Sequence, residues 1–482
     1  MQSTVKGISA PVGMRCAEVY KTSRHLSMPG QTTLTIMKQW CHQESNRGHK
    51  DFQSFALPTE LWHPPCFRGK STCTASVSLE TECKGTIFFQ TTNTFPFRRS
   101  EQIGFSIVLP RGRVPKRALV PARKLLSMKL SAFKFDLPKH LIAMEPSPVR
   151  DESRLMVLHR KSGEIEHKEF KDILGYFGKG DSFVFNDTKV IPARLYGVKE
   201  KTDARIEVFL LRELDESNKL WDVLVDPARK IRIGNKICFG PDRSLIAEVV
   251  GNTVNGGRAL KFQYDGQHEE FKSYIYALGV PPLPDYIKRP VVEEDFERYQ
   301  TVFAKHEGSV IAPGAGLHFS RELMIRLELA DIRKAFLTVH CGLENLEDKK
   351  VEDLSKHKKN NEKMIVSNEC CEKTRLSVEA GKEVVAVGCS TLRALETAVS
   401  TDGLLKPFDG WTNLYITPLN EDKPYEARLA TSLVTGFHMS CSQALFMTCG
   451  MGGYKPVMKA YKLAIKEGYK FGIYGDAMLI TD

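Results

Sequence analysis

The spacing of hydrophobic and polar positions changes several times along this chain. After residue 300, short apolar runs alternate with segments of helical spacing. Because strands that alternate with helices usually pair in parallel, this pattern predicts an α/β domain with a mostly parallel sheet. We expect strands at 335–339, 383–387 and 414–417, and helices after Ser320, at 369–380, at 391–400, after Ser440 and at 454–467.

Between residues 190 and 268 the pattern is a series of short runs rich in strand-forming residues. Strands are expected at 206–211, 221–225, 231–233, 236–239, 245–250 and 260–264, with a hairpin turn at Gly234-Asn235 and a short helix at 271–278. Many short strands close together predict a small β-barrel or sandwich. We therefore expect an α/β catalytic domain made of residues 128–189 and 285–482, with a β-barrel domain inserted at 190–284.

Residues 1–127 show little periodicity, and we expect no clear fold for them. They hold 18 Lys and Arg against 7 Asp and Glu, a difference of +11 that equals the net charge of the whole chain. The segment suits an organelle transit peptide, since Glu18 is the one acid among its first 43 residues. Alternatively it is not native protein and Met128 is the true start, which is the interpretation that we adopt.

The remaining residues are electrically neutral, so net charge does not indicate a nucleic-acid partner, and only a local patch would. One candidate is a lysine stripe at 455–470, which fits either phosphate contacts or a solvated helix face. No apolar run reaches the ~18 residues that a membrane helix needs, so we expect no membrane partner. The 12 cysteines show no CxxC pair and no zinc spacing, which predicts free thiols and no metal. The stripe consists of Lys455, Lys459, Lys462, Lys466 and Lys470.

Three segments place polar side chains next to glycines. In 387–393 a strand, a small-residue turn and a helix start follow one another, which suits a bound carboxylate or phosphate but is also an ordinary loop of α/β proteins. His318 follows the glycines of 313–316, and His438 follows Gly436; each is either a general base or a packed core histidine. In the turn at 474–478, Asp476 either binds a ribose hydroxyl or an amine, or forms an Asx turn.

Polar segments at 135–138, 150–155, 185–195, 299–303, 316–319, 410–412 and 474–480 follow one another in a distinctive order. Over about residues 130–482 this set resembles the S-adenosylmethionine:tRNA ribosyltransferase-isomerase family of queuosine biosynthesis. The resemblance implies an α/β fold with an inserted barrel. It also implies transfer and isomerisation of the ribosyl moiety of S-adenosylmethionine to 7-aminomethyl-7-deazaguanine at the tRNA wobble position. Epoxyqueuosine forms, adenine and methionine leave, and no metal or redox cofactor is implied besides the co-substrate S-adenosylmethionine.

Such a reaction needs a base with a pKa near neutrality, and histidine is the natural type. His318 is the first choice, and Asp187 and Asp476 are the other catalytic candidates, which would hold ribose or the attacking amine. Ser390, Thr391 and Arg393 are expected to bind the methionine carboxylate. The other substrate-binding candidates are Asn186, Thr188, Arg194, Tyr299, Gln300, Thr301, Pro313, Gly316, His438 and Tyr474.

Several loops depart from the family pattern. Gly314 stands where the family usually has Thr, Lys359 stands where it usually has Met, and residues 342–346, 419–422 and 440–443 also differ. Because loops often carry function, these changes predict reduced activity and leave two alternatives open. One is a non-catalytic RNA-binding descendant, and the other is an S-adenosylmethionine-using enzyme with another acceptor. We expect a monomer in the cytoplasm.

Overall fold

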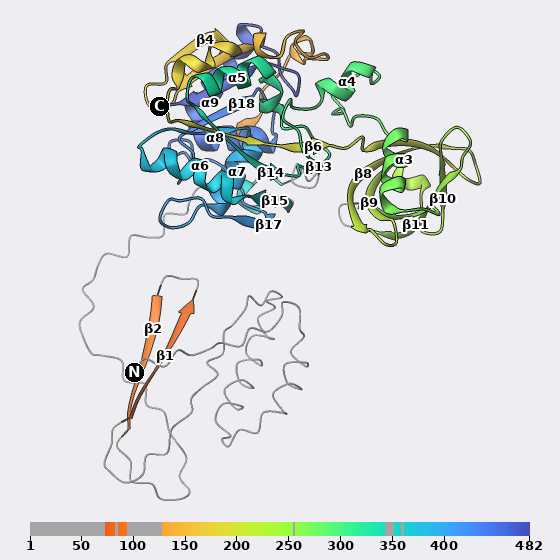
Figure 1. Cartoon of the computed structure of the whole chain (residues 1–482), viewed down its shortest axis with the longest axis horizontal. Helices are drawn as coiled ribbons and strands as arrows, with labels where there is room; N and C mark the ends of the chain where they lie inside the picture. The colour runs from red at the N-terminus through yellow and green to blue at the C-terminus, as the bar shows by residue number, and fades with distance from the viewer. Residues whose placement is uncertain (1–72, 82–84, 94–127, 254–255, 343–350, 358–360) are drawn as a thin grey trace, which may run out of the picture. The chain divides into compact units, whose positions relative to one another are not determined.

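The computed structural model describes residues 73–81, 85–93, 128–253, 256–342, 351–357 and 361–482 (Figure 1). The chain divides into two compact units, residues 1–114 and 115–482. In the first unit, β1 (Cys73–Thr81) and β2 (Gly85–Asn93) form an antiparallel pair. The identity expected for residues 1–127, a transit peptide or non-native segment, remains a prediction.

A nine-stranded sheet forms the centre of the second unit, in the order β17-β15-β14-β5-β16-β18-β19-β3-β4. Its middle run β14-β5-β16-β18 is parallel, as is the pair β19-β3, whereas the edge strands and the β18-β19 pair are antiparallel. The sheet is therefore mixed, with the expected parallel strands at its centre. The strands are β3 (Arg154–His159), β4 (Ile165–Glu169), β5 (Ser182–Asn186), β14 (Arg333–Val339), β15 (Glu362–Val366), β16 (Val384–Val387), β17 (Phe408–Thr412), β18 (Ser432–Gly436) and β19 (Ala477–Thr481).

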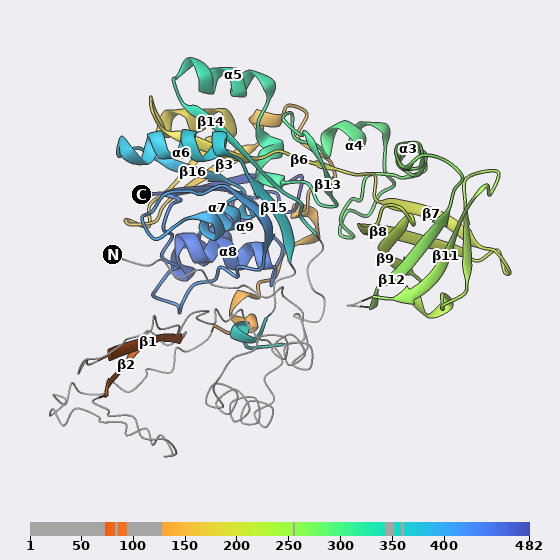
Figure 2. The ribbon, with the colours of Figure 1, turned by 60° about the horizontal axis from the view of Figure 1, so that its bottom comes forward.

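Helices cover both faces of this sheet, so its central strands are buried on both sides. Leu155 and Val157 of β3 pack with α5 (Arg321–Leu329), while Met156 and Leu158 belong to the core on the opposite face. Burial on both faces is the reason that these strands are apolar at nearly every position. Figure 2 shows α5 on one side of the sheet and α7 to α9 on the other. The opposite face is covered by α6 (Asn368–Glu379), α7 (Cys389–Ala398), α8 (Gln443–Gly452) and α9 (Tyr454–Lys466).

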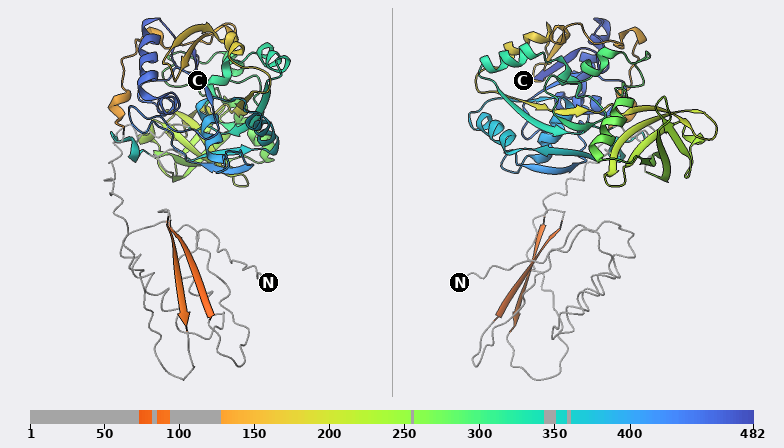
Figure 3. Two further views of the ribbon diagram at one scale, coloured as in Figure 1. Left: turned by 90° about the vertical axis from the view of Figure 1, so that its left-hand side faces the viewer. Right: turned by 45° about the vertical axis from the view of Figure 1, so that its right-hand side comes forward.

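Six strands close into the expected barrel, in the order β10-β11-β12-β9-β8-β7 (Figure 3). Its core is an apolar cluster that includes Trp221, Phe239 and Phe262, and α3 (His268–Leu278) packs against it through Phe271 and Ile275. The fold class predicted from the sequence, an α/β domain with an inserted barrel, is confirmed. The barrel strands are β7 (Arg194–Lys199), β8 (Arg205–Asp215), β9 (Leu220–Asp226), β10 (Lys236–Phe239), β11 (Leu245–Asn252) and β12 (Arg258–Gln263).

Two predicted strands are wrong. Residues 231–233 follow a short 3₁₀ helix (Ala228–Lys230) and precede a turn at Gly234, whose φ is +81°. Ile231 is buried in the barrel, but it does not pair with a neighbouring strand. At 414–417 Ile416 is buried, but the strand of this region lies earlier, at β17. In both cases burial produced an apolar pattern without strand pairing. The sequence pattern also missed β7, whose burial is mostly partial.

Short elements connect the two domains of the second unit. β6 (Thr188–Val190) leads from β5 toward the barrel and pairs in parallel with β13 (His306–Ser309), which leads back. Between the barrel and β13 lies the short helix α4 (Glu293–Arg298). A 3₁₀ helix, η8 (Gly314–His318), then precedes α5, whose first turn is capped by the Ser320 hydroxyl, as expected.

Candidate functional site

One edge of the central sheet, where its parallel strands end, collects several of the candidate residues. The parallel strands β5, β14, β16 and β18 end there. Strands β19 and β3 begin there, because Ala477 lies opposite both Gly436 and Leu155. This is the edge at which α/β folds bind ligands. The residues that flank it are Ser153, Asn186, Asp187, Gly388, His438 and Asp476.

His318, at the end of η8, is held by two contacts. Its Nδ1 lies 2.7 Å from the Ser153 hydroxyl, and its ring stacks on Phe170 with the ring centres 5.0 Å apart. The Ser153 hydroxyl also lies 3.4 Å from the Arg150 carbonyl, which can only accept. The consistent assignment is that Ser153 donates to this carbonyl and accepts from Nδ1–H, which leaves the Nε2 lone pair for a ligand.

The charge state of His318 follows from its surroundings. Its side chain is only 6% exposed, and this burial, assisted by the Arg150 guanidinium, lowers the pKa of His318 to about 4. The imidazole is therefore neutral at physiological pH and has a lone pair that can accept a proton, but its pKa lies below the near-neutral value expected from the sequence for the base.

Asp476 directly precedes the strand β19 and is 7% exposed. Its two carboxylate oxygens accept the backbone N–H groups of Arg154 and Lys470, at 2.9 and 2.7 Å. Burial raises the pKa of Asp476, and the two amide bonds act against this shift. The carboxylate is thus fixed in place by the backbone, and a carboxylate has further lone pairs for a ligand.

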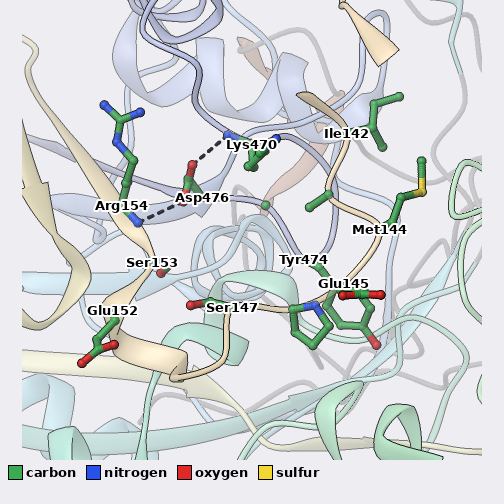
Figure 4. A pocket seen from close by; sticks show the side chains of 13 residues that line it. Ile142, Met144, Glu145, Ser147, Glu152, Ser153, Arg154, Lys470, Tyr474 and Asp476 are labelled. Carbon is green, nitrogen blue, oxygen red and sulfur yellow. Dashed lines mark hydrogen bonds between the residues drawn. The ribbon is translucent and has the colours of Figure 1, made fainter. Parts of the chain in front are cut away.

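A cavity of about 380 Å³ lies against Asp476 (Figure 4). Its walls come from residues 142–147 and 152–154, from Lys470 and from the turn at 474–476. A smaller hollow of about 20 Å³ contains His318 and shares the wall residues Ser147, Ser153 and Tyr474 with the cavity. The structure therefore brings together three of the predicted residues, His318, Tyr474 and Asp476.

Tyr474 stands between the two spaces. Its hydroxyl donates to the buried Asp295 carboxylate at 2.9 Å. Asp295 also receives both terminal nitrogens of Arg289, at 2.6 and 2.8 Å. A bidentate pair of this kind restricts both side chains, so it fixes the position of the tyrosine ring. The other predicted tyrosine, Tyr299, is fully buried and meets Tyr474 edge to face.

Asn186, Asp187 and Thr188 lie at the end of β5 and hold the sheet edge together. The side-chain amide of Asn186 donates to the carbonyl of Val339 through its nitrogen and accepts the N–H of Val339 through its oxygen. Asp187 accepts from the Thr338 hydroxyl at 2.6 Å, and burial raises the pKa of this carboxyl. The Thr188 hydroxyl lies 2.8 Å from Nδ1 of His340. That Asn186, Asp187 and Thr188 bind a ligand remains a prediction.

The start of α7 offers less to a carboxylate than its sequence indicates. Gly388, with φ +97°, begins the helix without a side-chain cap. The Thr391 hydroxyl donates to the carbonyl of Val387, and the buried Arg393 guanidinium forms an ion pair with Glu362. Ser390 is half-buried. A ligand role for Arg393 stays a prediction, and it would require that ion pair to open.

The other candidates have structural contacts of their own. Gln300 bonds the N–H and carbonyl of Val190, and Arg194 pairs with Glu207 in the barrel. A Cβ on Gly316 would stand 2.9 Å from Thr301, so glycine permits this close packing. Nε2 of His438 bonds the Thr435 hydroxyl, and burial lowers the pKa of His438 to about 4. Pro313 precedes η8 and accepts the N–H of Gly316.

Sequence reasoning missed one whole wall of the site. Glu145, Ser147, Glu152 and Ser153 line the cavity, yet they lie more than 300 residues from the turn at 474–476 that they face. The polar segment at 150–155 is part of the family resemblance, but nothing in it indicates which residues it meets. Only the pairing of β3 with β19 brings the two together.

Within the described residues, no helix has the length and apolar character to cross a membrane. The same residues contain no group of three or more His, Cys, Asp and Glu side chains arranged to hold a metal ion. Cys238, Cys370, Cys371, Cys441 and Cys449 are free thiols.

Comparison with known proteins agrees with the geometry. Residues 130–480 match the model of the family described as queuosine biosynthesis protein. A protein of Parabacteroides distasonis named S-adenosylmethionine:tRNA ribosyltransferase-isomerase is 62% identical over 353 residues, which cover 73% of this chain and all of that protein. A protein of Flavobacterium psychrophilum with the same name is 54% identical, with the same coverage.

A solved structure, an S-adenosylmethionine tRNA ribosyltransferase from Thermotoga maritima, is 33% identical and covers 72% of this chain and 99% of its own, with a TM-score of 0.40. The family match spans well over half of the chain and contains every predicted site residue. The resemblance inferred from the polar segments is confirmed, and this chain belongs to the queuosine biosynthesis protein family.

Proposed function

We propose that this chain transfers and isomerises the ribosyl moiety of S-adenosylmethionine onto tRNA. The acceptor is 7-aminomethyl-7-deazaguanine at the wobble position, and the product is epoxyqueuosine. The observation that carries this proposal is the neutral His318, oriented by Ser153 next to a cavity that ends at a backbone-held carboxylate. Family membership supports the same reaction, because relatives that this chain matches over their whole length are named for it.

The proposed reaction uses a neutral imidazole and a fixed carboxylate. The sulfonium of S-adenosylmethionine acidifies the adjacent 5′ carbon, and a neutral imidazole can accept that proton. The resulting ylide expels adenine, which departs with the proton that the imidazole took up. The acceptor ammonium loses a proton to solvent and attacks as the free amine, and the epoxide closes as methionine departs. His318 supplies the lone pair, and Asp476 supplies a fixed negative charge for the amine. The protein acts as a monomer, and the reaction requires no metal or redox cofactor.

The test is direct. S-adenosylmethionine is incubated with tRNA that carries the aminomethyl base, and released adenine, released methionine and epoxyqueuosine in the digested tRNA are quantified. We expect equal amounts of all three, with no effect of a chelator. The same tRNA with guanine at the wobble position is the control and should release no adenine.

The alternatives give different results. Binding of S-adenosylmethionine and tRNA without release of adenine would identify a non-catalytic descendant. Release of adenine that does not depend on the aminomethyl base would indicate another acceptor. Either result contradicts the proposal.

A further inference from the structure

The charges around the cavity are unbalanced. Three carboxylates line it, those of Glu145, Glu152 and Asp476, together with two basic residues, Arg154 and Lys470. The wall therefore carries more negative than positive charge.

Neither basic side chain forms an ion pair with those carboxylates, although the charges of Arg154 and Lys470 both act to lower the pKa of Asp476. The Arg154 guanidinium stacks 3.7 Å from the ring centre of Tyr469 and donates to the carbonyl of Glu467 at 2.7 Å. The Lys470 ammonium donates to the carbonyl of His140 at 2.8 Å. Their backbone amides, not their charged groups, bind Asp476, as Figure 4 shows. A buried carboxylate whose bonds come from neutral amides favours a cationic ligand.

We propose that this cavity holds the base to be modified, swung out of the tRNA stack, with its aminomethyl ammonium against Asp476. This rests on the proposed function and adds the location and the recognition of the acceptor. The 7-deazaguanine ring would lie along residues 142–147. Glu145 and Glu152 are exposed and carry acceptors of the kind that suits the N–H groups of a guanine edge.

The position of the cavity agrees with a base bound with its aminomethyl group at Asp476. Lys470 lines the cavity, is solvent-exposed and follows the lysine-bearing helix α9. The phosphate backbone of an RNA bound along that helix would therefore lead to the cavity. The shared wall of Ser153 and Tyr474 connects the amine at Asp476 to the hollow that contains His318. S-adenosylmethionine also carries a cation and a purine ring, so the experiment must distinguish these two ligands.

The first experiment measures equilibrium binding of three probes: tRNA with the aminomethyl base, the same tRNA with guanine at that position, and S-adenosylmethionine alone. Wild-type protein should prefer the aminomethyl tRNA by about tenfold or more, the usual strength of a hydrogen bond to a charged group. Asp476→Asn should bind the two tRNAs equally and keep its affinity for S-adenosylmethionine. Glu164→Gln removes an exposed carboxylate outside the cavity and should behave as wild type.

The second experiment does not depend on the folding of a variant. Met144 lines the cavity, whereas Met324 is buried in α5. In wild-type protein with labelled methionine methyl groups, free 7-aminomethyl-7-deazaguanine should shift the Met144 signal and leave Met324 unchanged. S-adenosylmethionine should shift Met144 less.

Three results would overturn the proposal. These are equal affinity of the wild type for both tRNAs, a preference that survives in a folded Asp476→Asn protein, and a Met144 signal that shifts with S-adenosylmethionine but not with the free base. Turnover is measured separately. If the enzyme is active and gives any of these results, the assignment of this cavity to the base is wrong, while the proposed reaction still holds. If the enzyme is inactive but binds the probes as predicted, the proposed reaction is wrong, while the assignment of the cavity still holds.

Discussion

His318 combines a buried ring with an ionisable nitrogen, and this combination makes stability depend on pH. In the unfolded chain a histidine binds a proton below about pH 6.5, but in the folded protein His318 does so only below about pH 4. Stability from this group is therefore complete above pH 6.5 and is lost as the pH falls toward 4.

We expect the free energy of unfolding to decrease by up to about 3 kcal/mol between these pH values because of His318 alone. Denaturant unfolding at a series of pH values would measure the slope, and His318→Gln should reduce it. An equally steep slope in His318→Gln would show that other groups cause the dependence.

The same substitution tests catalysis. His318→Gln should lower turnover by ~10²-fold or more, the usual contribution of a general acid–base residue. At pH 7.5 its stability should change by about 1 kcal/mol or less, because Gln can still bond the Ser153 hydroxyl. Ser153→Ala keeps the imidazole but removes the bond that orients it, so turnover should fall by about tenfold. Normal turnover per folded molecule in His318→Gln would make His318 a packed core histidine.

Gly314 allows a test of the altered loop before His318. Thr at this position adds a hydroxyl and stiffens the backbone, so Gly314→Thr should raise turnover or affinity for S-adenosylmethionine by about tenfold. A Cβ there would stand 2.9 Å from the end of the Ile473 side chain, which must move. The double variant with Ile473→Val removes this contact and should show the gain more clearly. Steady-state kinetics decide, and a loss of activity in both variants would contradict the prediction.

At the scale of elements, local patterns are sufficient for helices and insufficient for strand partners. The sequence predicts that Ser320 caps a helix, and it does so, because a cap depends on three neighbouring residues. The apolar runs at 231–233 and 414–417 predict strands, but burial without pairing produces the same pattern. His318 and Asp476, which the glycine-rich segments single out, line a hollow and the adjoining cavity, and their roles stay predictions. Their partners Ser153 and Glu145 could not be predicted, since strand order determines which distant segments meet.

The helix α9 presents the lysine stripe that the sequence predicts. Lys455, Lys459, Lys462 and Lys466 lie on this helix, and Lys470 follows it. All five are exposed, and the opposite side of the helix buries Val457 and Tyr461. Lys455 is bound to Asp422 at 2.5 Å, so the test uses Lys459, Lys462 and Lys466. Replacing these three with Ala should weaken tRNA binding. It should also reduce the slope of log binding constant against log salt concentration by about 0.9 for each phosphate that the protein no longer neutralises. Binding isotherms at several salt concentrations measure the slope, and an unchanged slope would identify a solvated face.

At the scale of the whole molecule, the described site lies entirely within the family match, which begins at residue 130. All of the net positive charge lies before Met128, whereas the site residues all lie after it. Met128 is itself part of the core and is 7% exposed. Leu354 donates its N–H to the Met128 carbonyl, and Leu130 donates to Glu352. The ordered contacts of the second unit thus include Met128 directly.

These contacts predict where the chain can be shortened. A protein that begins at Met128 should unfold as cooperatively as the full chain and keep its tRNA affinity and turnover. A protein that begins at Phe135 loses Phe133, which is fully buried and packs edge to face on Phe446 and Tyr454. Loss of a buried phenylalanine costs about 3–5 kcal/mol, so this second protein should unfold at clearly lower denaturant concentration. If the protein from Met128 aggregates, or loses tRNA binding that the full chain has, the basic segment is functional and its interpretation as non-native is wrong.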